Sequence, residues 1–258
     1  MRNNSTWALS ALSPTPWPPE AFRVPLTLLT AFGAIFFAIV PALAYVVVGA
    51  LLGVIDPRHP KDIAANQLLL AQLVTYAPLG IFLVFALPRV AHVSLPALGL
   101  RKPTARELAI GAAGTVVMWL LVSVVGGTIA ALSHRHDTET AVALLQQMKS
   151  PAERLLFFAI ACILAPMIEE LAFRVFLYNA LTRYVSVPAA IVVSGFIFGV
   201  VHSASLTQLL TVSLPLAVGG MVLAYVYART RSYWASVTTH ALFNSISVVA
   251  IFVFHAKP

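Results

Sequence analysis

Residues 169–174 read Glu-Glu-Leu-Ala-Phe-Arg and interrupt a long apolar run that begins at Leu155 and resumes after Arg174. A charged side chain costs about 2.5–3.5 kcal/mol at the centre of a membrane helix, so charges persist there when they are paired or functional. Glu170 and Arg174 are spaced i, i+4 on one helix face and can form an ion pair. Glu169 points about 100° away and has no such partner. The hexad indicates either a structural ion pair with a spare carboxylate or, as we prefer, a functional site in a membrane helix.

The composition sets the fold class. The chain has 258 residues, of which 60% are hydrophobic and 10% charged, and its mean hydropathy is +0.90. A soluble domain carries about 25% charged residues. Long apolar runs predict transmembrane helices, whereas a membrane β-barrel would show short alternating segments. We therefore expect an all-α, polytopic transmembrane helix bundle.

The charge balance and the cysteine count exclude other classes. The net charge of +7 comes from basic residues that lie between the apolar runs. They are better explained as determinants of topology than as a nucleic-acid surface. The single Cys162 excludes an internal disulfide and a cysteine-rich metal site.

Four regions follow from the pattern of apolar and polar residues. Residues 1–25 form a proline-rich arm that we expect to be disordered, and residues 26–132 are expected to form the N-terminal transmembrane helices. Residues 133–150 are expected to form a loop with a short interfacial helix, and residues 151–258 the core transmembrane helices. About seven spans are expected, at 26–54, 67–87, 108–132, 152–181, 188–206, 209–228 and 234–254, and the last four carry the polar site. Gly195 and Gly199, spaced i, i+4 in the fifth span, would let another helix approach closely.

The basic connectors predict the orientation. Placing the connector 89–106 in the cytoplasm also places the N-terminus there, and the loop between the fifth and sixth spans, which has no Lys or Arg, then faces outward. We expect an integral protein of a bacterial cytoplasmic membrane. No internal repeat is visible, which disfavours an inverted-repeat transporter.

Three further polar residues lie in the apolar spans: His202, His240 and Asn244. They can be satisfied in hydrocarbon by converging with Glu169, and convergence makes a polar cavity that water can enter. A carboxylate beside an imidazole can activate that water as a general base, without a serine or cysteine nucleophile. His240 and Asn244, spaced i, i+4, could hold the oxyanion of a tetrahedral intermediate. Glu169 with both histidines also resembles an open zinc site, although the HExxH signature is absent.

The order of these motifs resembles the CPBP family, which groups CAAX prenyl proteases with bacteriocin-processing and immunity proteins. That family carries EExxxR, FxxxH and HxxxN on successive core helices, and this chain has Glu169-Glu170-x-x-x-Arg174, Phe198-x-x-x-His202 and His240-x-x-x-Asn244. The connector 98–101 is also similar to a segment that often precedes the core. The resemblance covers about residues 151–247. One departure is Val175, where a glycine often follows the arginine.

The resemblance implies an intramembrane CAAX-type endopeptidase that acts on membrane-associated peptides or proteins. Glu169 and His202 would activate water, and His240 and Asn244 would form the oxyanion site. Glu170, Arg174 and Phe198 would support these residues. We favour a mechanism without a cofactor, because His240 and Asn244 suit an oxyanion better than a metal, with a Zn²⁺ enzyme as the alternative.

Two other functions fit the same residues. A non-proteolytic scaffold or immunity protein of the family would use the polar cluster to bind a partner. A proton-coupled transporter would use it as a relay, but the missing repeat makes this the weakest interpretation. Several polar residues are not placed by the sequence, namely Gln67, Gln72, Tyr76 and Gln208.

Overall fold

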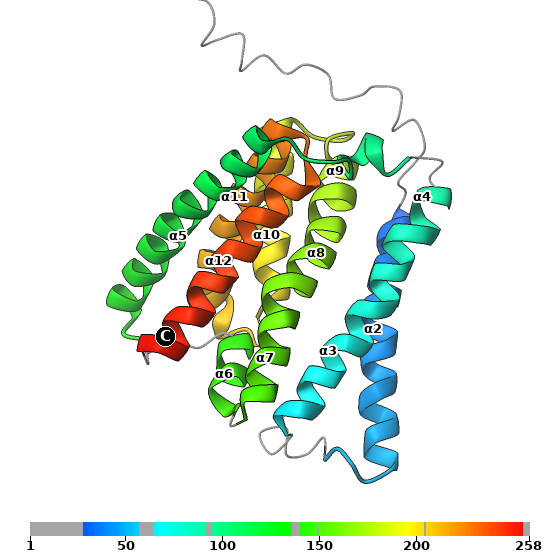
Figure 1. Ribbon diagram of the computed structural model, residues 1–258, viewed down its shortest axis with the longest axis vertical. Helices are drawn as coiled ribbons and strands as arrows, with labels where there is room; N and C mark the ends of the chain where they lie inside the picture. The colour runs from blue at the N-terminus through cyan, green and yellow to red at the C-terminus, as the bar shows by residue number, and fades with distance from the viewer. Residues whose placement is uncertain are drawn as a thin grey trace, which may run out of the picture.

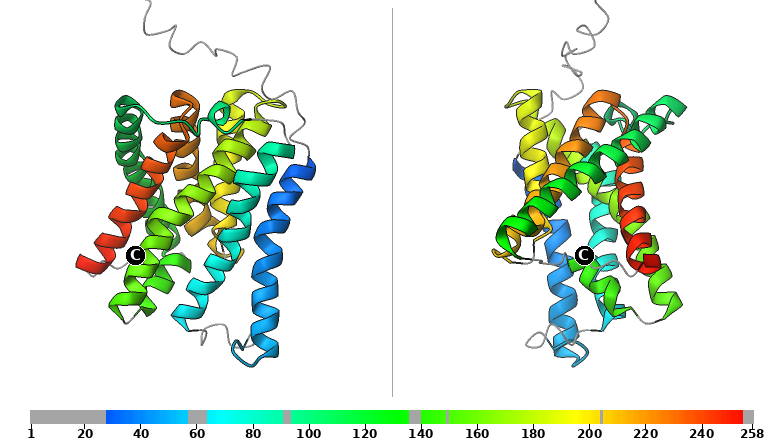
Figure 2. Two further views of the ribbon diagram at one scale, coloured as in Figure 1. Left: turned by 45° about the vertical axis from the view of Figure 1, so that its right-hand side comes forward. Right: turned by 90° about the vertical axis from the view of Figure 1, so that its left-hand side faces the viewer.

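The computed structural model describes residues 28–56, 64–90, 94–135, 140–148, 150–203 and 205–254, all in helices and short connections without a strand. The proline-rich arm predicted at residues 1–25 lies outside these ranges. Figure 1 shows α2 and α3 side by side at one edge of the bundle and α5 at the opposite edge. The rod that contains α7 and α8 lies between them with α10, α11 and α12, as the turned views also show (Figure 2). Polytopic helical architecture is therefore confirmed.

The helices follow the apolar runs closely. Some spans contain π-helical turns, so several elements make one continuous rod. The elements are α2 Leu28–Leu51; α3 Ala65–Ile81 with η2 Phe82–Ala86 and α4 Leu87–Val90; the 3₁₀ turn η3 Pro96–Leu98; α5 Ala105–Ser133; α6 Thr140–Gln147; the rod α7 Pro151–Ala159, η4 Ile160–Leu164, α8 Ala165–Glu170, η5 Leu171–Tyr178 and α9 Asn179–Leu181; α10 Val187–Val201; η6 Leu209–Ser213 with α11 Leu214–Thr230; and α12 Tyr233–Phe254.

Five helices of the described chain are long and apolar enough to cross a membrane: Asn66–Val90, Ala105–Ser133, Pro151–Leu181, Leu209–Thr230 and Tyr233–Phe252. Two predicted spans appear as shorter apolar helices, Ile39–Leu51 and Val187–Val201. The fifth predicted span ends at Val201 rather than at residue 206. Its 15 residues rise only about 22 Å, short of the ~30 Å hydrocarbon core. His202 is the C-terminal cap residue of this short helix.

The central rod begins at a well-defined cap. The Ser150 side chain accepts a hydrogen bond from the Glu153 amide and the Glu153 side chain accepts one from the Ser150 amide, with Pro151 at the first helical position. This reciprocal capping satisfies amides that would otherwise lack partners. Two π-helical stretches, η4 and η5, then flank the α8 segment that carries both glutamates. Such turns recur at functional sites because the extra residue changes which side chains face a given direction.

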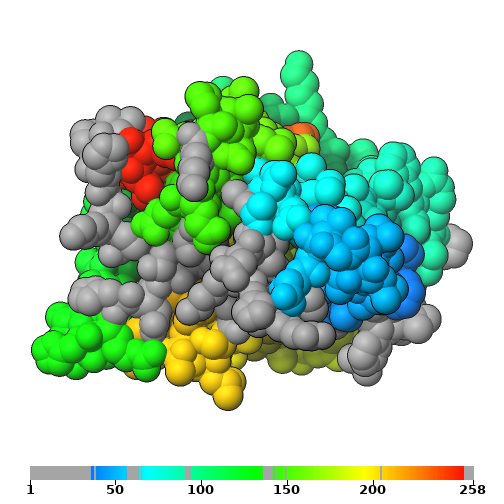
Figure 3. Space-filling model, turned by 90° about the horizontal axis from the view of Figure 1, so that it is seen from below, coloured from blue at the N-terminus to red at the C-terminus, as the bar shows by residue number. Residues whose placement is uncertain are grey.

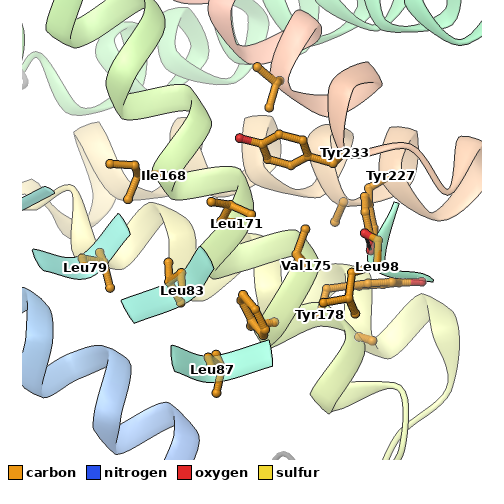
Figure 4. Close-up of a cluster of buried hydrophobic side chains, with 14 residues drawn as sticks. Leu79, Leu83, Leu87, Leu98, Ile168, Leu171, Val175, Tyr178, Tyr227 and Tyr233 are labelled. Atoms are coloured by element: carbon orange, nitrogen blue, oxygen red, sulfur yellow. Dashed lines mark hydrogen bonds between the residues drawn. The ribbon is translucent and has the colours of Figure 1, made fainter. Parts of the chain in front are cut away.

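A buried apolar cluster joins α3 to the central rod (Figure 4). Leu79 and Leu83 on the α3 side are buried against Ile168 and Leu171 of α8 and η5. Gly80 permits a close approach, because a Cβ there would lie 3.2 Å from the Ile168 Cδ1 atom. In lipid, such van der Waals packing holds helices together. The cluster therefore fixes the N-terminal helices against the helix that carries the carboxylates.

Two glycines of α10 allow the closest packing in the core. A Cβ on Gly195 would lie 2.6 Å from the Met221 amide nitrogen, and one on Gly199 would collide with the Ser213 carbonyl oxygen. The close approach predicted from their spacing is therefore confirmed, and its partner is the η6–α11 helix. This contact places Phe198 and His202 against the interior of the bundle.

We expect Gly199→Ala to lower the stability of the protein. The added methyl group would overlap the Ser213 carbonyl oxygen, so the η6–α11 backbone would have to shift. Overpacking of this kind costs about 1–3 kcal/mol. Gly127→Ala is the matched control, since nothing lies within 4 Å of a Cβ at Gly127 in α5. Thermal unfolding in detergent measures both variants. Equal unfolding temperatures for Gly199→Ala and wild type would contradict the close helix contact.

Candidate active site

A cavity of about 380 Å³ lies where the core helices meet α3. Four of the polar residues singled out from the sequence line it together, and Phe198 forms part of its wall. The complete lining is Gln72, Tyr76, Met118, Ile160, Ala161, Ala165, Glu169, Phe198, Val201, His202, Ser203, Leu216, His240, Phe243 and Asn244. The site is thus assembled by helices that are far apart in the sequence.

The two adjacent glutamates have different surroundings. Glu169 lines the cavity, whereas Glu170 and Arg174 are fully buried behind it. The Arg174 Nε atom lies 3.1 Å from Glu170 Oε2, which is the i, i+4 pair expected from the spacing. The other Glu170 oxygen, Oε1, accepts a hydrogen bond from His240 Nδ1 at 3.0 Å. Glu170 therefore links the central rod to α12.

Phe198 packs between the charged residues and the histidines. Its ring lies under the Arg174 guanidinium at 4.7 Å, and its centroid is 4.5 Å from that of His202 and 5.6 Å from that of His240. A guanidinium over an aromatic face is a favourable cation–π contact, particularly when both groups are desolvated. The Phe198 ring therefore supports Arg174, His202 and His240 by packing against them.

Both histidines present Nε2 to one oxygen of Glu169. The Glu169 Oε2 atom lies 3.7 Å from His202 Nε2 and 3.8 Å from His240 Nε2. The other oxygen, Oε1, accepts a hydrogen bond of 2.7 Å from the Tyr76 hydroxyl. The carboxylate is thus held at one oxygen and faces the two imidazoles with the other.

The second nitrogen of each ring fixes its tautomer. His202 Nδ1 lies 2.7 Å from the Phe198 carbonyl oxygen, and His240 Nδ1 lies on the ion-paired Glu170 carboxylate. Both partners accept hydrogen bonds, so each Nδ1 carries a proton. In the neutral rings Nε2 is then an acceptor. His240 can donate from Nε2 only when it carries a second proton, and such a ring would have a carboxylate near each nitrogen.

Asn244 lies one helical turn beyond His240 on the same wall of the cavity. Its amide nitrogen donates to the Ala161 carbonyl oxygen at 2.8 Å, within the π-helical turn η4. That bond assigns the orientation of the amide, because a carbonyl needs a donor opposite it. One N–H of Asn244 remains for another acceptor.

The geometry does not match a metal site. Among the described residues, no group of three or more His, Cys, Asp or Glu side chains is arranged to hold a metal ion. Glu169 Oε2 lies 3.7 and 3.8 Å from the two Nε2 atoms, and we derive no step through a metal.

The structure adds residues that the sequence did not place. Gln72 and Tyr76 of α3 line the cavity, and their i, i+4 spacing in an apolar span was the available signal. Gln67 instead donates to the Val54 carbonyl oxygen at 2.7 Å and helps to cap α3. Gln208 is not part of the lining.

Comparison with known proteins gives a family match and a similar curated protein. Residues 151–246 match a family model described as type II CAAX prenyl endopeptidase Rce1-like. A Bacillus subtilis (strain 168) protein, provisionally named the membrane peptidase YdiL, is 32% identical over 94 residues, which are 36% of this chain and 36% of that protein. No solved structure gives a significant match.

The fold and the site define a polytopic membrane protein with a glutamate–histidine centre between its helices. The matched core, with its three motifs in order, is similar to the CAAX prenyl endopeptidase family that this model describes. The similarity covers residues 151–246, so α2, α3 and α5 lie outside it.

We expect Arg174→Met to destabilise the protein by about 3–5 kcal/mol, because it leaves the buried Glu170 carboxylate without its partner. Arg101→Met is the matched control. Arg101 forms an exposed pair with Glu107. The hydrogen bonds that Arg101 donates to this carboxylate raise the pKa of Arg101, but exposed pairs contribute less than about 1 kcal/mol. Thermal unfolding compares the two variants, and similar losses would contradict a structural role for the buried pair.

Proposed function

We propose that the protein is an integral-membrane endopeptidase of the CAAX-protease type, which hydrolyses a peptide bond of a membrane-associated protein or peptide. The observation that supports this most directly is the position of Glu169. Its free oxygen faces two imidazole nitrogens in a cavity between apolar helices. A carboxylate at membrane depth is costly, so its retention beside two histidines favours chemistry over structure.

In the proposed reaction, Glu169 acts as the general base. A water within ~2.8 Å of both Glu169 Oε2 and His202 Nε2 would be oriented by both atoms. Its proton passes to Glu169 while its oxygen bonds to the scissile carbonyl carbon. Glu169 then returns the proton to the amide nitrogen as the carbon–nitrogen bond breaks. The products are a carboxylic acid and an amine, and no covalent enzyme intermediate is needed.

The negative oxygen of the tetrahedral intermediate needs hydrogen-bond donors that line the same cavity. Asn244 has one N–H beyond the bond to Ala161, and a doubly protonated His240 would add Nε2–H. Donors held in place before the reaction stabilise developing charge without reorganisation. Glu170 holds the His240 ring, and the Ala161 carbonyl holds the Asn244 amide.

We expect Glu169→Gln to abolish cleavage, with a loss of at least about 10²–10⁴-fold from the missing base. The measurement is mass spectrometry of peptide termini from membranes that express wild type or variant at matched levels. Termini present only with wild type identify a protease and its substrates. Identical termini in both samples would favour the scaffold or immunity protein, in which the cluster only binds a partner.

Metal independence is a separate proposal. We expect cleavage by the purified protein to be unchanged by 1,10-phenanthroline and EDTA, because the proposed base needs no metal. Elemental analysis of the same preparation is the control for residual zinc. Activity that is lost with chelator and restored by added Zn²⁺ would establish the metalloprotease alternative.

The orientation is also proposed from charge. Gly99 lies against the turn between α11 and α12, where its carbonyl accepts a hydrogen bond from the Tyr233 amide at 3.1 Å. This end of the bundle also holds α4 and α9 (Figure 1). The arginines in or next to these segments therefore gather at one end, namely Arg89, Arg101, Arg183 and Arg231. The positive-inside rule assigns that end to the cytoplasm. The opposite end holds α6, with the ends of α2 and α3 to one side (Figure 3).

A further inference from the structure

We propose that α3, which lies outside the matched segment, supplies two residues to the active site. Tyr76 positions the catalytic glutamate, and Gln72 accepts a hydrogen bond from a backbone N–H of the peptide substrate. The substrate role of Gln72 rests on the proposed protease function, whereas the contact made by Tyr76 does not.

The placement of α3 follows from its packing. Gly80 lies against the Ile168 side chain, at the residue before Glu169, and Leu79 and Leu83 lie in the same buried cluster as Ile168. Tyr76 is one helical turn before Gly80, so the contact that anchors α3 also delivers the tyrosine to the carboxylate. Gln72 lies one further turn along the same face, and both line the cavity.

Tyr76 determines which way Glu169 faces. The terminal torsion of a glutamate is broad, so an unheld carboxylate rotates among many orientations. The 2.7 Å bond from the Tyr76 hydroxyl occupies Oε1, which leaves Oε2 facing His202 and His240. Tyr76 acts on the reaction through Glu169, so it is a positioning residue.

Gln72 offers an acceptor where a peptide needs one. Its side-chain oxygen is buried and has no hydrogen-bond partner among the described residues, and leaving such a group unpaired costs about 1–3 kcal/mol. An extended peptide in this cavity presents backbone N–H groups that hydrocarbon cannot satisfy. The described chain has no strand edge to pair with them. The Gln72 amide oxygen, one helical turn from Tyr76, is suited to accept a hydrogen bond from such an N–H group.

The first test compares Tyr76→Phe with Tyr45→Phe. The assay uses a quenched fluorescent peptide. Its sequence is taken from the cleavage site that is cut in membranes with wild type but not in membranes with Glu169→Gln. We expect Tyr76→Phe to lower kcat about ten- to hundredfold with KM unchanged, because small misplacements of reacting groups have effects of this size. Tyr45 donates to the Gln67 carbonyl oxygen away from the cavity, so its variant should keep both constants. An unchanged kcat for Tyr76→Phe would overturn the positioning role.

A double-mutant cycle tests the same contact without any activity. Thermal unfolding is measured for Tyr76→Phe, for Glu169→Met, which removes both carboxylate oxygens, and for the double variant. If the two side chains interact, the effect of Tyr76→Phe on the unfolding temperature disappears once Glu169 is replaced. Additive shifts would overturn the contact even if the protein proves to be no protease.

The second test replaces Gln72 with methionine, which keeps the length of the side chain and removes its polar atoms. We expect KM for the same peptide to rise about tenfold with kcat nearly unchanged. The unfolding temperature should not fall, because the amide oxygen has no partner to lose. Gln147→Met is the control, at an exposed position of α6 outside the cavity.

The outcomes separate the two proposals. Normal cleavage by Gln72→Met with unchanged KM would overturn the substrate role of Gln72 alone. A parallel collapse of kcat and unfolding temperature would show a structural role instead. Absence of any Glu169-dependent cleavage by wild type would overturn both the protease function and the Gln72 proposal, and the unfolding cycle would then judge Tyr76 by itself.

Discussion

The buried pair of Glu170 and Arg174 is the interaction on which the site depends. Both side chains are fully buried, so each charge is tolerable only because the other lies beside it. Glu170 uses its second oxygen to hold His240, and Arg174 lies over Phe198, which packs against both histidines. Removing the pair would therefore disturb three helices as well as one ion pair. The neighbouring Glu169 is left free to face the cavity.

The pair also explains why two adjacent glutamates can differ in function. Successive helical residues point about 100° apart, so one carboxylate enters the protein interior and the other enters the cavity. The first is held by a cation and an imidazole, the second by a tyrosine hydroxyl at one oxygen only. Glu170 and its partners give rigid support, while Glu169 keeps one oxygen facing the cavity. This is the arrangement expected of a preorganised base.

The family match and the structure delimit the site differently. The matched segment ends at residue 246 and begins at 151, yet α3 contributes Tyr76 and Gln72 to the same cavity. The α3 helix therefore does more than cover the matched core. The packing of Leu79, Leu83 and Gly80 makes it part of the cavity wall.

The sequence by itself determined the helical membrane class and the approximate spans, because these follow from hydropathy. It also singled out Glu169, His202, His240 and Asn244 as polar residues in apolar runs. The Glu170–Arg174 pair follows from fixed spacing along one helix. Only the tertiary structure decided that α10 stops at Val201, that each histidine presents Nε2, and that Tyr76 holds Glu169. These features depend on which helices lie side by side. In a bundle that adjacency is set by packing between distant segments, such as Gly80 against Ile168, and no local pattern encodes it.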